Sequence, residues 1–250
     1  MNHKTLHESS LSIAASILLG SIIIAGSIAW SASPRTQAVP VAAGAAQAAN
    51  GQQQPSQPAP AAQSDISKLV TSGEAMIGNP AAKITIAYWY DYQCPFCKQN
   101  ELQTMPSIIS DYVNLGKVRI VFKDFAFLGP DSTKLALTAR AVWEAAPQQF
   151  LAWHDAMFQA QGQEGSGWAT DALINQVTTK VLGASGAAKV QTLLKANAAR
   201  YQKQIDADKA EGQAFGVQGT PGFVIGSKNG SKLIVGAQPY SNIKAAIDSL

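Results

Sequence analysis

The fold is decided by residues 83–103, which read KITIAYWYDYQCPFCKQNELQ. The first part of this stretch is rich in β-branched and aromatic residues, a pattern typical of a strand buried on both faces. The residues after Cys-Pro-Phe-Cys favour a helix, so Cys94 falls at its N-cap and Pro95 at its first position. Because proline interrupts helical hydrogen bonding, we expect Pro106 to kink or end this helix.

This placement determines the chemistry expected of Cys94. A free cysteine has a pKa of about 8.5, and only its thiolate is reactive. The unpaired N–H groups and the dipole of a helix N-terminus stabilise the thiolate, and cysteines so placed have pKa values of about 3.5–7.5. Cys97 lies one turn deeper on the same face and can meet the first sulfur. We predict that Cys94 is the attacking and departing sulfur and that Cys97 resolves the exchange.

A Cys-x-x-Cys pair can also bind zinc or form a purely structural disulfide. A structural zinc site needs four ligands, whereas the chain has two cysteines, and His154 is the only histidine in residues 64–250. The strand before the pair, the helix after it and the proline inside it favour the redox role over both alternatives. We expect no metal site and no organic cofactor beside the redox-active cysteine pair.

A second motif, Gly-Thr-Pro-Gly, lies at residues 219–222. It precedes the apolar stretch 223–225, and a turn signal at 228–230 then leads into another apolar stretch at 232–235, which predicts a β-hairpin. The motif is compatible with a cis Thr220–Pro221 bond, which would expose the Thr220 backbone to an extended peptide.

Three apolar stripes with helical spacing predict a helical bundle in the middle of the chain. The stripes are Leu135, Ala139, Val142, Trp143 and Ala146; Phe150, Trp153, Met157 and Phe158; and Val190, Leu193, Leu194, Tyr201 and Ile205. His154 lies on the second stripe, which favours a hydrogen-bonded, half-buried histidine over a catalytic one. Residues 240–248 predict a closing helix with Ser241 as a candidate cap.

The chain resembles the DsbA-type thiol–disulfide oxidoreductases over nearly all of residues 74–250, with residues 74–126 and 206–250 similar to the two halves of a thioredoxin fold. The resemblance is carried by DYQCPFC at 91–97, VRIVFK at 118–123 and GTPGFV at 219–224. It implies an α/β, thioredoxin-like fold with an inserted α-helical domain that caps the site and helps to form a groove for unfolded substrates. It also implies that the catalytic residues are Cys94, Cys97, Thr220 and a cis Pro221, with Phe96 and Thr220 contacting substrate.

Two departures from this family pattern concern acid–base chemistry. The best-known oxidant of this kind has a histidine between its cysteines, whereas this chain has Pro95 and Phe96. We therefore expect a less acidic Cys94 and a weaker oxidant, unless helix and backbone N–H groups compensate. Thioredoxin-type proteins often place a buried acid six residues before the first cysteine, and that position is Tyr88 here. We interpret Asp91 and Glu101 as solvated surface acids.

The first 63 residues differ from the rest of the chain, because only Lys4, Glu8 and Arg35 are charged among them. Residues 11–30 are largely apolar and carry no charge, although serines and glycines dilute their hydrophobicity, and their length favours a retained membrane anchor over a cleaved signal peptide. The Ala-, Gln- and Pro-rich residues after them are expected to form a flexible linker.

The expected domains are accordingly a signal peptide or anchor (1–30), the linker (31–63), the first thioredoxin-like half (64–126), the helical insertion (127–205) and the second thioredoxin-like half (206–250).

The function predicted from the sequence is an exported oxidase, on the periplasmic or extracytoplasmic side, that passes the Cys94–Cys97 disulfide to folding proteins. A membrane or soluble redox partner would have to reoxidise it. The net charge of +3 is spread without a basic run, which argues against nucleic acid as a partner. Three alternatives remain: an isomerase or reductase of the same fold, a non-catalytic peptide-binding module or holdase, and a metal carrier that uses both thiolates.

Overall fold

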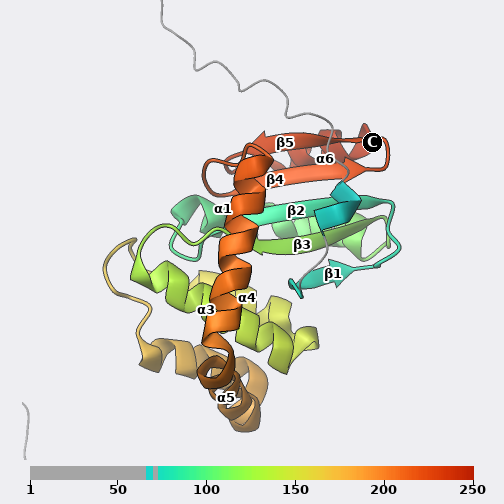
Figure 1. Cartoon of the computed structure of the whole chain (residues 1–250). Coiled ribbons are helices and arrows are strands. Elements are labelled where there is room, and N and C mark those ends of the chain that lie inside the picture. The colour runs from blue at the N-terminus through green and yellow to red at the C-terminus, as the bar shows by residue number, and fades with distance from the viewer. Residues whose placement is uncertain (1–65, 70–72) are drawn as a thin grey trace, which may run out of the picture. The chain divides into compact units, whose positions relative to one another are not determined.

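The computed structural model describes residues 66–69 and 73–250, which fold around a five-stranded sheet (Figure 1). Its strand order is β1-β3-β2-β4-β5, with β2 and β3 parallel and the other neighbours antiparallel. The strands are β1 (Met76–Gly78), β2 (Ile84–Tyr90), β3 (Val118–Asp124), β4 (Gly222–Ser227) and β5 (Gly230–Val235). This α/β architecture is the thioredoxin-like fold expected from the sequence.

Helices cover both faces of the sheet, and several of them lie between β3 and β4 in the sequence. Figure 1 shows α5 crossing the near face of the sheet and α6 lying behind it. The α-helices are α1 (Pro95–Gln103), α2 (Met105–Ile108), α3 (Pro130–Ala145), α4 (Phe150–Ala160), α5 (Asp171–Ala214) and α6 (Tyr240–Asp248). Shorter helical segments are η1 (Ile66–Leu69), η2 (Ile109–Val113) and η3 (Pro147–Gln149).

The central strand β2 is buried on both faces because its side chains alternate between two hydrophobic clusters. Ile86, Tyr88 and Tyr90 belong to the larger cluster, which continues into α1, α2, α6 and the helices between β3 and β4. Ala87 and Trp89 belong to a smaller cluster on the opposite face, with η1 and the residues just before β4. The strand therefore passes through the middle of the core and carries the cysteine pair at its end.

The helical insert consists of α3, α4 and much of α5, and nearly all members of the predicted stripes are buried or half-buried in its core. α5 bends at Gly183, which has a positive φ of 75° that glycine adopts without strain. The helix then continues past residue 205, so the expected domain boundary falls inside α5. Its last turns lie against the sheet, where the Asp208 carbonyl accepts a hydrogen bond from Trp89 Nε1 at 2.8 Å.

Several helix ends follow the sequence signals and one does not. Pro95 is the first residue of α1, which ends at Gln103, and Pro106 is the second residue of α2, so the helix is interrupted close to Pro106 as expected. The expected cap of α6 is wrong. The helix follows Pro239, and Ser241 is its second residue rather than its cap. Pro239 is the N-cap residue of this helix, and no side chain makes a capping hydrogen bond there.

A buried network of charged side chains joins the insert to the sheet. From α3, Arg140 Nε donates to Asp124 Oδ2 at 2.6 Å, and Arg140 Nη2 donates to Asp208 Oδ2 of α5. Lys123 Nζ lies 3.0 Å from Glu74 Oε1 and 3.2 Å from Asp208 Oδ1. Because each buried charge has a partner of opposite sign, the network fixes the insert against β3 without an unpaired ion.

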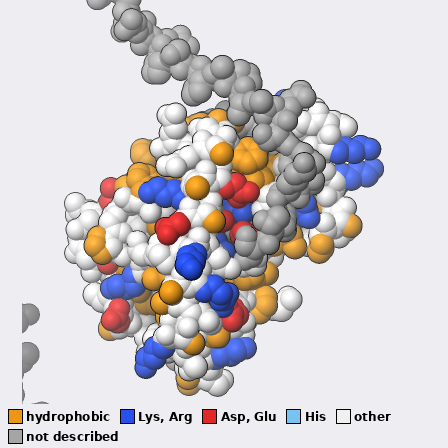
Figure 2. Space-filling view, in the orientation of Figure 1, with side chains coloured by type: hydrophobic (Ala, Val, Ile, Leu, Met, Phe, Trp, Pro, Cys, Tyr) orange, Lys and Arg blue, Asp and Glu red, His pale blue; other side chains and the backbone are white. Residues whose placement is uncertain are grey.

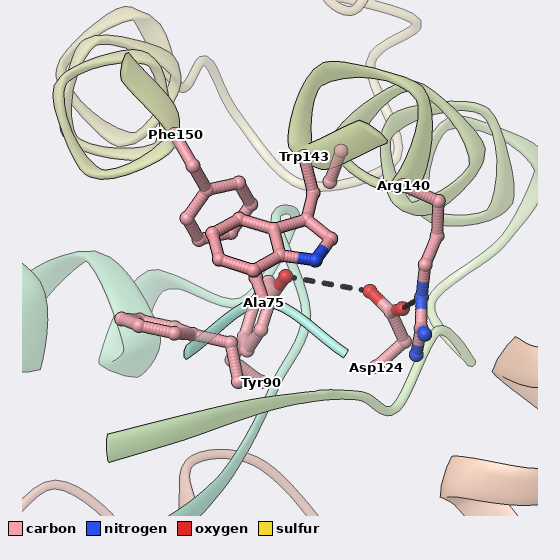
Figure 3. A pocket seen from close by; sticks show the side chains of 8 residues that line it. Ala75, Tyr90, Asp124, Arg140, Trp143 and Phe150 are labelled. Carbon is pink, nitrogen blue, oxygen red and sulfur yellow. Dashed lines mark hydrogen bonds and ion pairs between the residues drawn. The ribbon is translucent and has the colours of Figure 1, made fainter. Parts of the chain in front are cut away.

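A small cavity lies beside this network (Figure 3), where the Tyr90 hydroxyl and the Arg140 guanidinium both reach Asp124. It is lined by Ala75, Tyr90, Phe122, Asp124, Ala139, Arg140, Trp143 and Phe150. Its volume of about 10 Å³ is at the lower limit for a single water molecule. This cavity between the insert and the sheet is therefore too small to bind a substrate.

Figure 2 shows basic and acidic side chains intermixed on the face of the molecule over which α5 runs. Within residues 66–69 and 73–250, no helix has the length and apolar character needed to cross a membrane. The anchor expected at 11–30 and the linker expected at 31–63 lie outside the described residues.

Candidate active site

The cysteine pair sits at the start of α1, directly after the loop that follows β2. Cys94 is the N-cap residue, with an extended backbone (φ −71°, ψ 119°), and Pro95 begins the helix. The sequence predicted this arrangement, which is confirmed. Both cysteines are free thiols; Cys94 is 5% exposed, whereas Cys97 is completely buried.

The environment of Cys94 stabilises its thiolate. A hydrogen bond from the Cys97 thiol is the largest influence and, against the opposing effect of burial, the pKa of Cys94 falls from 9.0 to about 6. The Thr220 side chain lowers this pKa further, as do the backbone N–H groups of Phe96 and Cys97 at the start of α1. A lowered pKa of this kind favours the thiolate of Cys94 at neutral pH.

Cys97 has the opposite character. Burial raises the pKa of the Cys97 thiol well above 9, and the hydrogen bond to Cys94 and the charge of its thiolate raise it further. The two sulfurs therefore differ in chemistry as well as in exposure. One is an ionised sulfur near the surface, and the other is a protonated thiol beneath it.

The Thr220–Pro221 loop lies directly against the first cysteine. β4 pairs with β2 so that Gly222 stands opposite Trp89, which brings the residues before β4 to the end of β2 from which Cys94 follows. The Thr220–Pro221 peptide bond is cis. Cys94 Sγ lies 3.3 Å from the Thr220 carbonyl oxygen, to which this sulfur can donate a hydrogen bond only when it is protonated. The two sequence motifs, more than 120 residues apart, thus form one site.

Asp91 is buried, and the interpretation of this residue as a solvated surface acid is wrong. It is 1% exposed, and its carboxylate accepts backbone hydrogen bonds from Gln93 at 2.8 Å, Phe127 at 2.9 Å and Leu128 at 3.1 Å. Three N–H donors replace the water that a surface carboxylate would bind. Asp91 therefore ties the cysteine loop to the segment that follows β3.

Gln161, at the end of α4, is a site residue that the sequence analysis did not identify. Its Nε2 donates to the Tyr92 carbonyl at 2.6 Å and to the Cys94 carbonyl at 3.0 Å. Through this side chain, the insert holds the backbone of Cys94 in place. A glutamine at a helix end has no sequence signal for this role, because its partners lie 67 and 69 residues away.

Glu101 is also buried, at 2% exposure, so its interpretation as a surface acid is wrong as well. The insert covers this face of α1, and Glu101 Oε1 lies 3.2 Å from His154 Nε2 of α4. His154 Nδ1 is in turn 2.7 Å from the Tyr92 hydroxyl. His154 is hydrogen-bonded, as predicted, but it is fully rather than half buried.

Two exposed aromatic side chains belong to the cysteine motif and to the segment bonded to the cysteine loop. Phe96, between the two cysteines, is 60% exposed, and Phe127 is 44% exposed. Phe127 also borders a hollow of about 440 Å³ that includes Val217 and Gln218, just before the Thr220–Pro221 loop. Large exposed aromatic side chains beside a reactive sulfur form a surface suited to unfolded polypeptide.

The part of the chain described by the structure contains no cluster of three or more His, Cys, Asp or Glu side chains arranged to hold a metal ion. The two free cysteines at the start of α1 support the exchange of one sulfur–sulfur bond for another. An ionised first sulfur, a protonated second sulfur and an adjacent cis-proline loop on this fold define a thiol–disulfide oxidoreductase of the DsbA type.

Comparisons with known proteins agree with this class. The chain belongs to the thioredoxin family, whose family model matches residues 70–249. It is 28% identical over 181 residues to disulfide bond formation protein D of Bacillus subtilis (strain 168), a match that covers 70% of this chain and 76% of the relative.

Two solved structures have the same fold and identities near that of the curated relative. The crystal structure of oxidised BdbD from Bacillus subtilis is 25% identical with a TM-score of 0.64, and the match covers 76% of this chain and 96% of that one. A periplasmic thioredoxin-like protein from Salmonella enterica serovar Typhimurium is 26% identical with a TM-score of 0.58, covering 74% and 93% respectively.

Proposed function

We propose that this oxidoreductase works as a thiol oxidase, which passes the Cys94–Cys97 disulfide to exported proteins as they fold. The observation that carries the proposal is the position of Cys94 at the N-cap of α1, where the backbone N–H groups of Phe96 and Cys97 and the Cys97 thiol lower its pKa to about 6. A stabilised thiolate is a good leaving group and favours the reduced form of the enzyme, which makes the disulfide form a stronger oxidant. The backbone N–H groups and Thr220 compensate in part for the missing histidine between the cysteines.

The reaction proceeds through a mixed disulfide. A substrate thiolate attacks Cys94 Sγ, the Cys94–Cys97 bond breaks, and its electron pair leaves on the Cys97 sulfur, which takes up a proton. A second substrate thiolate then attacks the substrate sulfur bound to Cys94 and expels the Cys94 thiolate. The substrate has lost two electrons and gained a disulfide, and the enzyme has gained the two electrons as a reduced pair.

Substrate contacts in this proposal come from both sequence motifs. The Thr220 carbonyl is adjacent to Cys94 Sγ and can accept a hydrogen bond from an extended peptide once the sulfur is engaged. Pro221 has no N–H and so offers no competing donor at the sulfurs. Phe96 supplies exposed apolar area on the helix side of the pair. We assign Cys94, Cys97, Thr220 and Pro221 to catalysis and Phe96 and Thr220 to substrate binding.

A thiol oxidase of this kind also requires a compartment where disulfides persist and an acceptor for its electrons. The apolar residues 11–30 support export, with an anchor in the inner membrane, to a compartment where disulfides persist. No organic cofactor takes part, so a second redox protein must accept the two electrons from the reduced pair. The substrates are reduced or unfolded exported proteins rather than nucleic acids.

The test is the equilibrium between the protein and a glutathione buffer, followed by oxidation of a reduced, unfolded substrate protein. The oxidase predicts a reduction potential above about −230 mV and rapid transfer of the disulfide. A potential near about −270 mV, the thioredoxin value, would instead assign the protein to reductases.

Matched cysteine variants separate catalysis from peptide binding. Cys94→Ser removes the attacked sulfur and should abolish substrate oxidation, whereas Cys97→Ser leaves it and should accumulate a mixed disulfide when treated with a substrate disulfide. If Cys94→Ser left the action of the protein on unfolded substrates unchanged, that action would not depend on disulfide exchange, and the protein would be a non-catalytic peptide-binding module or holdase.

A further inference from the structure

The backbone carbonyl of Cys94 is the point at which the insert bonds to the cysteine pair. Cys94 is the N-cap residue of α1, so its carbonyl oxygen accepts the first hydrogen bond of the helix, from the Lys98 N–H at 3.2 Å. Gln161 Nε2 donates to the same oxygen at 3.0 Å and to the Tyr92 carbonyl at 2.6 Å. One side-chain amide of the insert therefore bridges the carbonyl groups on either side of Gln93.

Gln161 is itself held in place. It is 9% exposed, its backbone N–H donates to the Phe158 carbonyl at 3.2 Å, and its backbone carbonyl accepts a hydrogen bond from Lys98 Nζ at 3.0 Å. The loop that follows is tied to the cysteine loop as well, because the Gly165 N–H donates to Gln93 Oε1 at 2.9 Å. A side chain with fixed surroundings can in turn fix the groups to which it bonds.

The backbone N–H of Cys97 is a donor for which two acceptors compete. It belongs to the third residue of α1, and such an N–H has no carbonyl partner four residues earlier within the helix. It reaches both the Cys94 carbonyl oxygen, 3.1 Å from the nitrogen, and the Cys94 sulfur. A carbonyl oxygen has two lone pairs, and the Lys98 N–H and Gln161 Nε2 can fill both. The Cys97 N–H is then left to the sulfur.

The direction of this N–H matters most when Cys94 is ionised. The side chain of an N-cap residue accepts hydrogen bonds from the second and third residues of its helix, which are Phe96 and Cys97 here. Hydrogen bonds to an ionised acceptor are roughly twice as strong as those to a neutral one, and the sulfur of a disulfide carries no charge. The contacts of Gln161 therefore favour the reduced protein over the oxidised protein.

We propose that Gln161 is a positioning residue through which the helical insert raises the oxidising strength of the Cys94–Cys97 disulfide. It acts by holding the Cys94 carbonyl, which leaves the first N–H groups of α1 to the sulfur. The inference rests on the proposed disulfide exchange and gives the insert a part in setting the equilibrium of that exchange.

The step that Gln161 favours is the departure of Cys94 from the mixed disulfide. A substrate thiolate attacks the substrate sulfur bound to Cys94, a substrate disulfide forms, and the electron pair of the broken bond leaves on Cys94 Sγ as a thiolate. No proton or electron passes through Gln161. Stabilising the departing thiolate speeds this step and shifts the equilibrium towards the reduced enzyme and the oxidised substrate.

The elements around Cys94 bring few charges to it. On α1, Cys97 is the neighbouring thiol, and Lys98 Nζ donates to a backbone carbonyl of the insert. In the cysteine loop, the carboxylate of Asp91 accepts hydrogen bonds from backbone N–H groups. Residues 217–222 contain no titratable side chain. Apart from burial, the main influences on the pKa of Cys94 are hydrogen bonds, which is the kind of influence that Gln161 controls.

The test compares the full-length wild-type protein with Gln161→Met, which keeps the length of the side chain but has no donor. The equilibrium of each protein with glutathione is measured across a pH series, together with the rate at which iodoacetamide modifies Cys94. In the variant we expect the pKa of Cys94 to rise by about one unit and the equilibrium constant for reduction to fall about tenfold at about pH 8. At about pH 5 the two proteins should agree, because Cys94 is protonated in both.

This pH dependence separates a positioning role from a structural one. A hydrogen bond that only stabilised the fold would stabilise the oxidised and reduced proteins equally, so its loss would leave the equilibrium with glutathione unchanged at every pH. Urea unfolding of the oxidised form measures that shared loss of stability. Gln163→Met, at an exposed position two residues further on, is the matched control and should keep the wild-type equilibrium.

If Gln161→Met does not fold, Gln161→Asn takes its place, because its amide is one methylene group too short to bridge the two carbonyl groups. It should shift the pKa and the equilibrium in the same direction. Wild-type values in the folded variant, or a change of equal size at both ends of the pH series, would overturn the inference. A wild-type potential near that of thioredoxin would instead contradict the proposed oxidase, whereas the difference between variant and wild type would still test the role of Gln161.

Discussion

The two cysteines differ because Cys94 is the N-cap residue of α1, whereas Cys97 lies three residues further on, inside the helix. Cys94 has N–H groups and the Cys97 thiol turned toward it, whereas burial and then the neighbouring Cys94 dominate at Cys97 and raise its pKa. The pKa of Cys94 is lower in the folded protein than in an unfolded chain, so ionisation of this thiol stabilises the reduced protein. The stabilisation is complete above the pKa of a free thiol and is lost as the pH falls through about 6. The asymmetry predicts that an alkylating reagent modifies Cys94 alone at neutral pH.

Single residues also mark where the sequence interpretation failed. The roles of Cys94 and Pro95 follow from local rules for helix termini, which need no knowledge of the rest of the chain. Asp91 and Glu101 were misjudged because their burial depends on segments that pack over them from elsewhere in the chain. One signal was present: Glu101 is four residues after Cys97, and a residue at that spacing shares the buried face of a helix.

At the scale of elements, the close approach of α5 to β2 depends on a glycine. A Cβ atom at Gly212 would lie 2.7 Å from Nε1 of the buried Trp89 indole, and that nitrogen is held by the Asp208 carbonyl. The helix therefore has no room to gain a side chain at this position.

We predict that Gly212→Ala lowers the free energy of unfolding by about 1–3 kcal/mol, because the overpacked helix must move away from the sheet. Urea unfolding followed by Trp fluorescence measures this change. Gln213→Ala, at the neighbouring exposed position, is the control and should change stability by less than about 0.5 kcal/mol. A Gly212→Ala protein as stable as the wild type would show that this contact does not limit the packing.

The strands and helices divide into those with a strong local pattern and those without one. The apolar runs of β2 and β4 and the stripes of α3 and α4 were predictable because burial on a sheet or in a bundle leaves a periodic trace. The full length of α5 was not, because its partner changes from the insert to the sheet, and its apolar stripe does not continue through the last turns.

At the scale of the whole molecule, the Arg140 network holds the insert on the sheet. Arg140 bonds to Asp124 and Asp208, which are 3% and 2% exposed and lie 16 and 68 residues away in sequence. Such pairs could not be predicted from one sequence, since a charged residue within a helix usually faces solvent. The relative placement of insert and sheet thus depends on contacts that only the folded chain reveals.

We predict that Arg140→Met lowers the free energy of unfolding by about 3–5 kcal/mol, because buried Asp124 loses its cation and buried Asp208 keeps only Lys123. The control is Arg200→Met, whose pair with Glu144 is on the surface, with side chains 48% and 39% exposed. That change should cost about 1 kcal/mol or less. Equal losses for both variants in urea unfolding would contradict a special role for the buried network.

The most direct test of the whole account is the rate at which iodoacetamide modifies Cys94 in the reduced protein, measured across a pH series. Mass spectrometry of the digested protein assigns the modification to Cys94 or Cys97. The account predicts a midpoint near pH 6, a plateau above it and no modification of Cys97 in this range. A midpoint near 9, as for a cysteine in an unfolded peptide, would contradict it.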